Sequence, residues 1–196
     1  MARYLVGITG GMASGKSTVV RWLGEAGFLV FDADRIVAEL YAPGGRGAAA
    51  VRDLFGESVL QDDGSVDHPT VAGIVFADPD ARKDLEAAIH PLVHQRFAEL
   101  AAAADGVVVY EATLMVESGG HRAFDLVISV EAPVEQRLAW AVERGMDEAA
   151  ARARLEAQGD GAERRAGAHR TLENDGTLED LRAKVDALIV ELKARI

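Results

Sequence analysis

The sequence predicts an α/β fold, a three-layer sandwich in which a parallel sheet of about five strands lies between helices. Short apolar runs rich in β-branched residues recur at residues 3–9, 28–31, 106–110 and 126–130. Apolar residues at helical spacing occupy much of the sequence between these runs. One strand–helix–strand unit is complete within the first 34 residues. Such units give parallel sheets, because the helix must carry the chain back before the next strand begins.

The first unit consists of RYLVGIT at residues 3–9, a helix and a second apolar run. RYLVGIT is short and stops at a glycine pair, which is typical of a buried strand. A helical pattern begins at Lys16 and ends at Gly27, and residues 28–31 then form the second strand.

Residues 35–105 differ in character and predict a mostly helical insert between the second and third strands. This stretch is rich in alanine and charged residues, and apolar residues repeat at helical spacing over residues 85–100. No strand pattern interrupts it. His90-Pro91 breaks the helical pattern, and the favoured interpretation is a new helix starting there.

The remaining elements return to the sheet pattern. We expect strands at 106–110 and 126–130, a helix at 133–143, a mobile flap at 145–167, a short strand at 170–172 and an amphipathic helix at 178–195. The flap is polar, contains arginines and is broken by Gly159-Asp160-Gly161. Seven arginines between Arg137 and Arg170 are interpreted mainly as a solvated helical face.

Composition excludes several function classes. The net charge of -11 argues against a broad surface for nucleic acid or anionic membranes. The absence of cysteine excludes a disulfide framework, a thiolate metal site and a cysteine nucleophile. No apolar run approaches the ~20 residues of a membrane span, and no N-terminal secretory pattern is present. We therefore expect a cytoplasmic protein with a small-molecule substrate and no obligate protein partner.

The glycine-rich stretch after the first strand satisfies the pattern G-x-x-x-x-G-K-[ST]. It consists of Gly10, Gly11, Met12, Ala13, Ser14, Gly15, Lys16 and Ser17. Its glycines let consecutive backbone N–H groups point at a phosphate, and the following helix adds its positive end. Lys16 is expected to bind the β- and γ-phosphates, and the Ser17 hydroxyl to coordinate Mg²⁺. The sequence thus predicts a P-loop NTPase fold that binds ATP.

Three carboxylates follow predicted strands, where ligands of open parallel sheets bind. Asp32 and Asp34 follow the second strand, and Glu111 follows the third. Phosphorylation of a hydroxyl needs a base that orients it, so a catalytic role is favoured for the aspartates over a helix N-cap. Glu111 either resembles a Walker B acid or caps a helix beginning near Leu114.

Taken together, these segments resemble the dephospho-CoA kinase family. The likeness is carried by GITGGMASGKSTV (7–19), VFDADRIVAEL (30–40), LEAAIHPLV (85–93), RLEAQ (154–158) and AHRTLENDG (168–176), in the family's order along nearly the whole chain. The P-loop alone would fit many functions, whereas this combination is specific.

The resemblance implies a role for each matching position. Thr9 to Thr18 would hold ATP and Mg²⁺, and Asn174 would lie in the loop on the nucleotide side. Asp34 would act as general base on the ribose 3′-hydroxyl of dephospho-CoA, with Asp32 close by.

The acceptor and lid residues follow in the same way. The remaining predicted contacts are His90 and Glu111 toward the acceptor, and Arg144, Arg154 and Gln158 in a closing lid. The corresponding domains are a nucleotide-binding core (1–34, 106–144 and 168–196), a helical acceptor-binding insert (35–105) and a lid (145–167).

The chain departs from the family pattern at three places. Residues 111–117 read EATLMVE, where relatives usually have Asp-x-Pro-Leu-Leu-x-Glu. Trp140 stands where an arginine is expected, and His169 where an aspartate is expected.

Two other function classes remain as alternatives. Nucleoside monophosphate, shikimate and gluconate kinases share the P-loop core, but the insert here is longer than a small polar acceptor needs. A switch-type NTPase would bind a nucleotide and signal through mobile loops. The Asn-Lys-x-Asp pattern of a GTPase is absent from the sequence.

Overall fold

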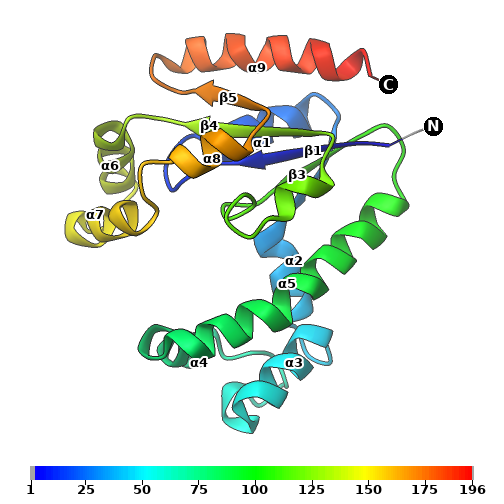
Figure 1. Cartoon of the computed structure of the whole chain (residues 1–196), viewed down its shortest axis with the longest axis vertical. Coiled ribbons are helices and arrows are strands. Elements are labelled where there is room, and N and C mark those ends of the chain that lie inside the picture. Colours follow the sequence, from blue (N-terminus) through cyan, green and yellow to red (C-terminus); the bar gives the residue numbers. More distant parts are fainter. Residues whose placement is uncertain (1–2, 196) are drawn as a thin grey trace. The chain divides into compact units, whose positions relative to one another are not determined.

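A five-stranded sheet forms the centre of the larger of two compact units in the computed structural model, which describes residues 3–195 (Figure 1). Its strands are β1 (Tyr4–Thr9), β2 (Leu29–Asp32), β3 (Val107–Glu111), β4 (Leu126–Glu131) and β5 (Arg170–Glu173). They lie in the order β2-β3-β1-β4-β5, and β1 pairs in parallel with both β3 and β4. The predicted α/β fold is therefore confirmed.

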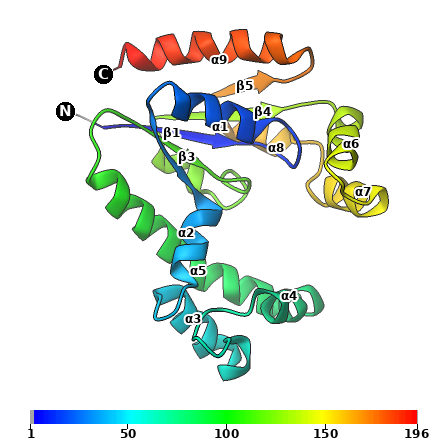
Figure 2. The ribbon, with the colours of Figure 1, turned by 180° about the vertical axis from the view of Figure 1, so that it is seen from behind.

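Helices cover both faces of this sheet. The helices of the larger unit are α1 (Lys16–Glu25), η2 (Gly120–Ala123), α6 (Val134–Glu143), α7 (Glu148–Ala157), α8 (Ala162–Gly167) and α9 (Leu178–Lys193). Figures 1 and 2 show α1 on one face and α8 on the opposite face. The three layers follow from burying both sides of a mostly apolar parallel sheet.

Alternation along the strands separates two buried layers. Val6 and Ile8 of β1 belong to the apolar core that α1 and α9 complete, together with Leu23 and Leu192. Residues of the opposite parity face the other layer, and there Gly7 lies close to Met115. Because successive side chains of a strand point to opposite faces of the sheet, the alternate residues Val6 and Ile8 contribute to the apolar core on one face.

The smaller unit spans Asp32–Ala103 and is helical, as predicted. It contains α2 (Ala33–Leu40), α3 (Arg46–Phe55), η1 (Glu57–Val59), α4 (His68–Ala77) and α5 (Pro79–Ala102). The long helix α5 contacts α2, α3 and α4 and forms the centre of this unit.

The expected helix start at His90-Pro91 is wrong. Helix α5 runs through Pro91 without a break over its 24 residues. Ile89 and Val93 are buried on either side of the proline, and Phe97 and Ala101 continue the same face. Packing of these four buried residues compensates for the hydrogen bond that Pro91 cannot donate. Tertiary contacts therefore keep the helix continuous where the local sequence predicts a break.

The flap predicted at 145–167 contains the two helices α7 and α8. They are joined through Gly159 and Gly161, both with positive φ. Ala151 and Leu155 of α7 are buried in a small cluster with Leu138 of α6. So few apolar residues give only a weak helical pattern, which explains why the sequence did not indicate a helix here.

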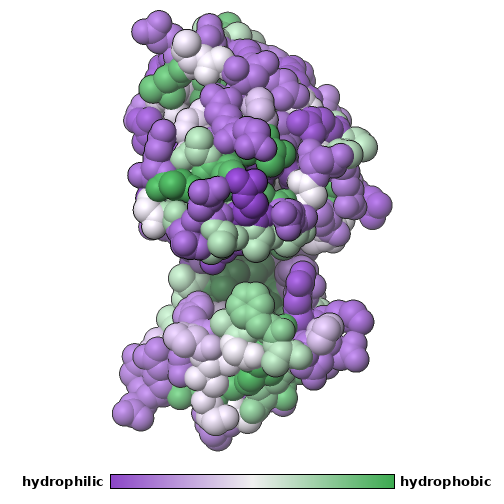
Figure 3. All heavy atoms as spheres, turned by 90° about the vertical axis from the view of Figure 1, so that its left-hand side faces the viewer, coloured by the Kyte–Doolittle hydropathy of each residue, from purple (hydrophilic) through white to green (hydrophobic). Residues whose placement is uncertain are grey.

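Hydropathy differs between the surfaces of the two units. Figure 3 shows a largely hydrophilic surface on the larger unit and a gathering of apolar side chains on the smaller one. Phe76 of α4 contributes to the exposed apolar surface of the smaller unit, with 89% of its area accessible. Among residues 3–195, no helix combines the length and hydrophobicity that crossing a membrane requires.

The packing of α9 leads to a first prediction. Leu192→Ala should lower the free energy of unfolding by about 2–5 kcal/mol, because Leu192 is fully buried and its truncation leaves a cavity. Leu178→Ala is the matched control on the same helix, because Leu178 is 64% exposed. Urea denaturation measures both variants, and equal losses would contradict the assigned core.

Candidate active site

The loop between β1 and α1 has the backbone geometry of a phosphate cradle. Gly15 precedes α1 with φ 96°, no side chain caps this helix, and its first turn contains no acidic residue. The first N–H groups and the positive end of the helix dipole therefore remain for an anion. Gly10 has φ 154°, and a Cβ there would lie 2.4 Å from the Val130 oxygen. Both glycines are needed for the conformation and for the close approach of neighbouring chain.

A pocket of about 200 Å³ lies on this loop. Its lining residues are Gly11, Met12, Ala13, Ser14, Gly15, Lys16, Ser17, Thr18, Thr113 and Arg144. The Ser14 hydroxyl is buried and has no hydrogen-bond partner in the described chain. A buried hydroxyl without a partner is costly, so a ligand oxygen at this position would satisfy it. The pocket residues therefore fit a polyphosphate.

Lys16 forms an ion pair with Glu111, which is the last residue of β3. Both side chains are nearly buried, at 12% and 11% exposure. This contact places Glu111 beside the phosphate loop, as a Walker B acid would be. The alternative, a cap for a helix near Leu114, is wrong, because residues 113–119 form turns that lead into η2.

Thr9 and Asn174 hold the ends of the loop. Thr9 is fully buried, and its hydroxyl donates to the Thr113 carbonyl at 2.9 Å. The side-chain amide of Asn174 donates to the Ser14 carbonyl at 2.9 Å, and its backbone N–H donates to Glu131 O at 2.7 Å. Asn174 thereby connects the end of β4 to the loop.

Arg137 and Gln158 bind the tip of the loop from the side of α6 and α7. Gln158 Oε1 accepts hydrogen bonds from Met12 N at 2.8 Å and from Arg137 Nη2 at 2.9 Å. Arg137 Nε donates to Met12 O at 2.8 Å. Arg137 is buried at 1% exposure, so the solvated face expected for the arginines of residues 137–170 is wrong for this one. Its sequence neighbourhood does not distinguish it from the exposed arginines around it.

The two predicted lid arginines lie at helix ends. Arg144 follows α6, is exposed and lines the pocket. Arg154 is exposed in the last turn of α7, and its side chain has no ion pair within residues 3–195. Arg144 is therefore brought to the phosphate loop, whereas Arg154 is not placed against it.

A buried ion pair supports this part of the fold. Arg164 Nε donates to Glu131 Oε1 at 3.0 Å, and its Nη1 donates to Glu117 Oε1, also at 3.0 Å. The Ser129 hydroxyl donates to Glu131 Oε1 at 2.6 Å. Burial acts to lower the pKa of Arg164, but the bonds to Glu131 and Glu117 outweigh it and raise that pKa. The pair stays charged and fixes α8 to the end of β4.

Asp32, Asp34 and His90 lie in the smaller unit, whereas Glu111, the other predicted acceptor contact, belongs to the larger one. Asp32 Oδ1 accepts from Asp34 N at 2.7 Å and from Arg35 N at 3.2 Å, which makes Asp32 the N-cap of α2. Asp34 lies in the first turn of α2, and its carboxylate is exposed.

His90 is half-buried on α5, one turn before His94. The pKa of His94 is lowered, first by burial and second by the neighbouring His90. Both histidines lie on one stretch of α5, because residues four apart share a helix face.

Known proteins are similar to this chain over nearly its whole length. A family model described as dephospho-CoA kinase matches residues 4–180. A dephospho-CoA kinase of Streptomyces avermitilis is 47% identical over 97% of this chain and 94% of that protein. One from Leifsonia xyli is 42% identical over 96% of this chain and 98% of its own length.

Solved structures show the same fold. A protein from Thermus thermophilus superimposes with a TM-score of 0.84 at 34% identity, over 98% of this chain and 99% of that chain. A shikimate kinase from Acinetobacter baumannii reaches 0.56 at 15% identity, over 98% and 94% of the two chains. That lower identity supports a shared architecture only.

The phosphate loop gives a second prediction. Lys16→Ala should lower kcat by at least ~10²-fold, because the transferred phosphoryl group loses its fixed counter-charge. Arg21→Ala, which removes an exposed arginine from the same helix, should leave kcat unchanged. Steady-state ADP release measures both, with circular dichroism to show that each variant is folded. Near-normal turnover of Lys16→Ala would refute the assignment of this loop.

Proposed function

This chain belongs to the dephospho-CoA kinase family, and we propose that it transfers the γ-phosphoryl group of ATP to the ribose 3′-hydroxyl of dephospho-CoA. The products are CoA and ADP, and the reaction is the last step of CoA biosynthesis. The observation that carries this proposal is the phosphate pocket of Gly11 to Thr18 in a chain whose relatives match it nearly end to end.

The nucleotide side follows from the loop. Backbone N–H groups of the loop and the N-terminus of α1 would bind the β-phosphate, while Lys16 would bind the β- and γ-phosphates. Lys16 would then exchange its carboxylate partner, Glu111, for phosphate oxygens.

Mg²⁺ fits the residues present. The exposed Ser17 hydroxyl lines the pocket, and the Glu111 carboxylate lies at the adjacent strand end. Mg²⁺ usually takes one or two protein oxygens and completes its shell with water and phosphates. When bound, it would neutralise charge on the β- and γ-phosphate oxygens. Ser17 would hold it directly, and Glu111 would orient its water.

Asp34 is the residue we propose as general base. Its carboxylate is exposed, whereas one carboxylate oxygen of Asp32 is already used to cap α2. In the transfer, the 3′-oxygen forms a bond to the γ-phosphorus, and the bond from that phosphorus to the β–γ bridging oxygen breaks. The hydroxyl proton passes to Asp34, and ADP leaves with the electron pair of the broken bond.

The smaller unit is the part we propose to bind the acceptor. Dephospho-CoA combines a charged adenosine diphosphate with a long, less polar pantetheine arm. His90 offers a polar contact, and the exposed apolar surface that includes Phe76 suits the arm. Arg144 and Arg154 are proposed to act on the phosphates when the lid closes, with Gln158 as a further residue of that lid. We propose the cytoplasm as the compartment, because both substrates are charged metabolites.

Acceptor choice is the third prediction and tests the proposed function. With ATP and Mg²⁺, dephospho-CoA should give a kcat/KM at least ~10²-fold above those of AMP, shikimate and gluconate, because only dephospho-CoA uses the whole insert. ADP release with each acceptor at equal concentration measures this. A preference for AMP or a small polyol would refute the substrate, and ATP hydrolysis with no acceptor preference would favour a switch-type NTPase.

The base leads to a fourth prediction. Asp34→Asn keeps the size of the side chain and removes its basicity, so kcat should fall by at least ~10²-fold with little change in ATP affinity. Asp32→Asn is the matched control, because asparagine caps helices as well as aspartate does. Single-turnover kinetics and ATP titration measure both variants. Loss of kcat in Asp32→Asn with normal Asp34→Asn would show that the two roles are reversed.

A further inference from the structure

We propose that Arg137 and Gln158 form a clamp that holds the tip of the phosphate loop in its binding conformation, and that both are positioning residues for nucleotide. The inference rests on the proposed function only in that ATP is taken to bind at this loop. It concerns the residue Met12, whose two backbone polar groups are both held by side chains from outside the loop.

Each backbone group of Met12 meets a side-chain group of the opposite hydrogen-bonding type. Met12 N–H donates to Gln158 Oε1, and Met12 O accepts from Arg137 Nε. Arg137 Nη2 donates to the same Gln158 oxygen, which closes the ring of contacts. Both partners of Oε1 are donors, so only the carbonyl side of the amide satisfies them.

The loop needs such a restraint at this point. Ala13, the next residue, has φ 57°, and it is the one non-glycine residue with positive φ among residues 3–195. A left-handed alanine costs free energy and persists where neighbouring contacts determine it. Fixing the peptide groups on both sides of Met12 restricts the loop to this conformation.

Arg137 also brings charge to the loop. It is buried, and within residues 3–195 no carboxylate forms an ion pair with it. A Cβ on Gly11 would lie 2.2 Å from Arg137 Nη2, so the guanidinium rests directly against the loop backbone. Burial, followed by the nearby Arg164, lowers the pKa of Arg137. The Glu131 carboxylate offsets only part of this effect, and a bound polyphosphate would add further negative charge.

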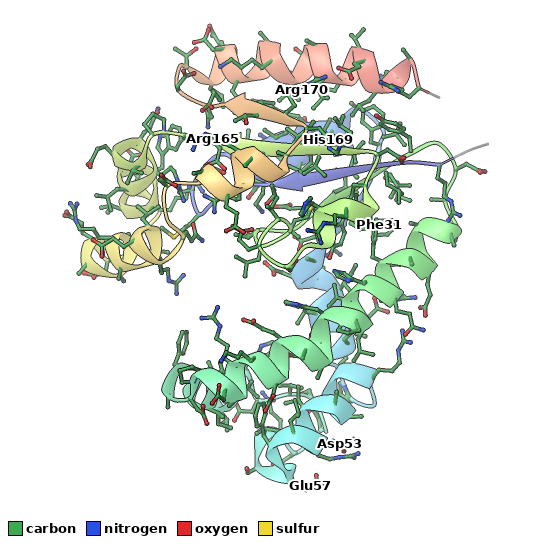
Figure 4. All side chains as sticks on the ribbon, in the orientation of Figure 1. Phe31, Asp53, Glu57, Arg165, His169 and Arg170 are labelled. Carbon is green, nitrogen blue, oxygen red and sulfur yellow. The ribbon has the colours of Figure 1, made fainter. Side chains whose placement is uncertain are left out.

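Gln158 is itself held in place by α8. Arg164 Nη1 donates to the Gln158 carbonyl at 3.3 Å, and Arg165 Nη1 donates to the Asp160 carbonyl at 2.8 Å. Figure 4 labels Arg165 on α8, beside the chain that returns from α7. The Arg164–Glu131 pair in turn fixes α8 to the sheet. A chain of direct contacts therefore leads from the end of β4 to Met12.

The test compares Gln158→Met with Gln158→Glu, by amide hydrogen exchange of Met12 in the ligand-free protein and by ATP titration without acceptor. Methionine keeps the length of the side chain but removes the oxygen that accepts the Met12 N–H. The exchange rate of the Met12 amide hydrogen and the Kd for ATP should therefore each rise at least ~10-fold. Glutamate keeps an acceptor oxygen, so Met12 exchange should stay within ~3-fold of the parent. Arg152→Ala is the control, because Arg152 is exposed on α7.

A second variant tests the other member of the clamp, Arg137. Arg137→Lys retains the charge and loses the forked contact to Met12 and Gln158. It should also raise the Kd for ATP about 10-fold, and the double variant with Gln158→Met should be little worse than either alone, because both act through Met12.

Unchanged Met12 exchange in Gln158→Met, or Kd values within ~2-fold of the parent for both single variants, would overturn the clamp. Because no acceptor is present, failure of the clamp is distinct from failure of the proposed substrate. Phosphorylation of dephospho-CoA with a Met12 amide insensitive to Gln158 would refute the clamp alone.

Discussion

The conformation of one short loop constrains the rest of the larger unit. Between Thr9 and Lys16 the chain turns from a strand into a helix whose first N–H groups have no side-chain cap and remain free for an anion. Such a loop leaves its own polar groups with few internal partners, so the partners come from elsewhere in the chain. Asn174 holds the Ser14 carbonyl and Thr9 holds Thr113, and both contacts bridge more than a hundred residues of sequence.

The buried Arg164–Glu131 pair shows how the surrounding fold meets this constraint. Two charges taken from water cost free energy unless they are paired and hydrogen-bonded, and Ser129 and Glu117 supply the additional bonds. Gly161 lies so close that a Cβ would come within 2.8 Å of Glu131 Oε2. The turn between α7 and α8 is therefore shaped around the ion pair as well as around the backbone angle of the glycine.

The sequence predicted what depends on local pattern and missed what depends on tertiary contact. The strands and the phosphate loop were found because their periodicity and glycine spacing are local. The continuity of α5 through Pro91 and the helix α7 were not found, because each depends on buried residues supplied by neighbouring helices. Arg137 was missed for the same reason, since nothing in its sequence neighbourhood separates a buried arginine from an exposed one.

The ion pair between Lys16 and Glu111 affects which anions can bind to the phosphate loop. An incoming ligand must displace a nearly buried carboxylate before it reaches the lysine, so its own contacts must exceed those of the pair. A lone chloride or inorganic phosphate engages few donors and competes poorly with a tethered carboxylate. A nucleotide tail spans the whole loop and competes well. The glutamate would thereby favour a polyphosphate, which contacts the whole loop, over a small anion that reaches only the lysine.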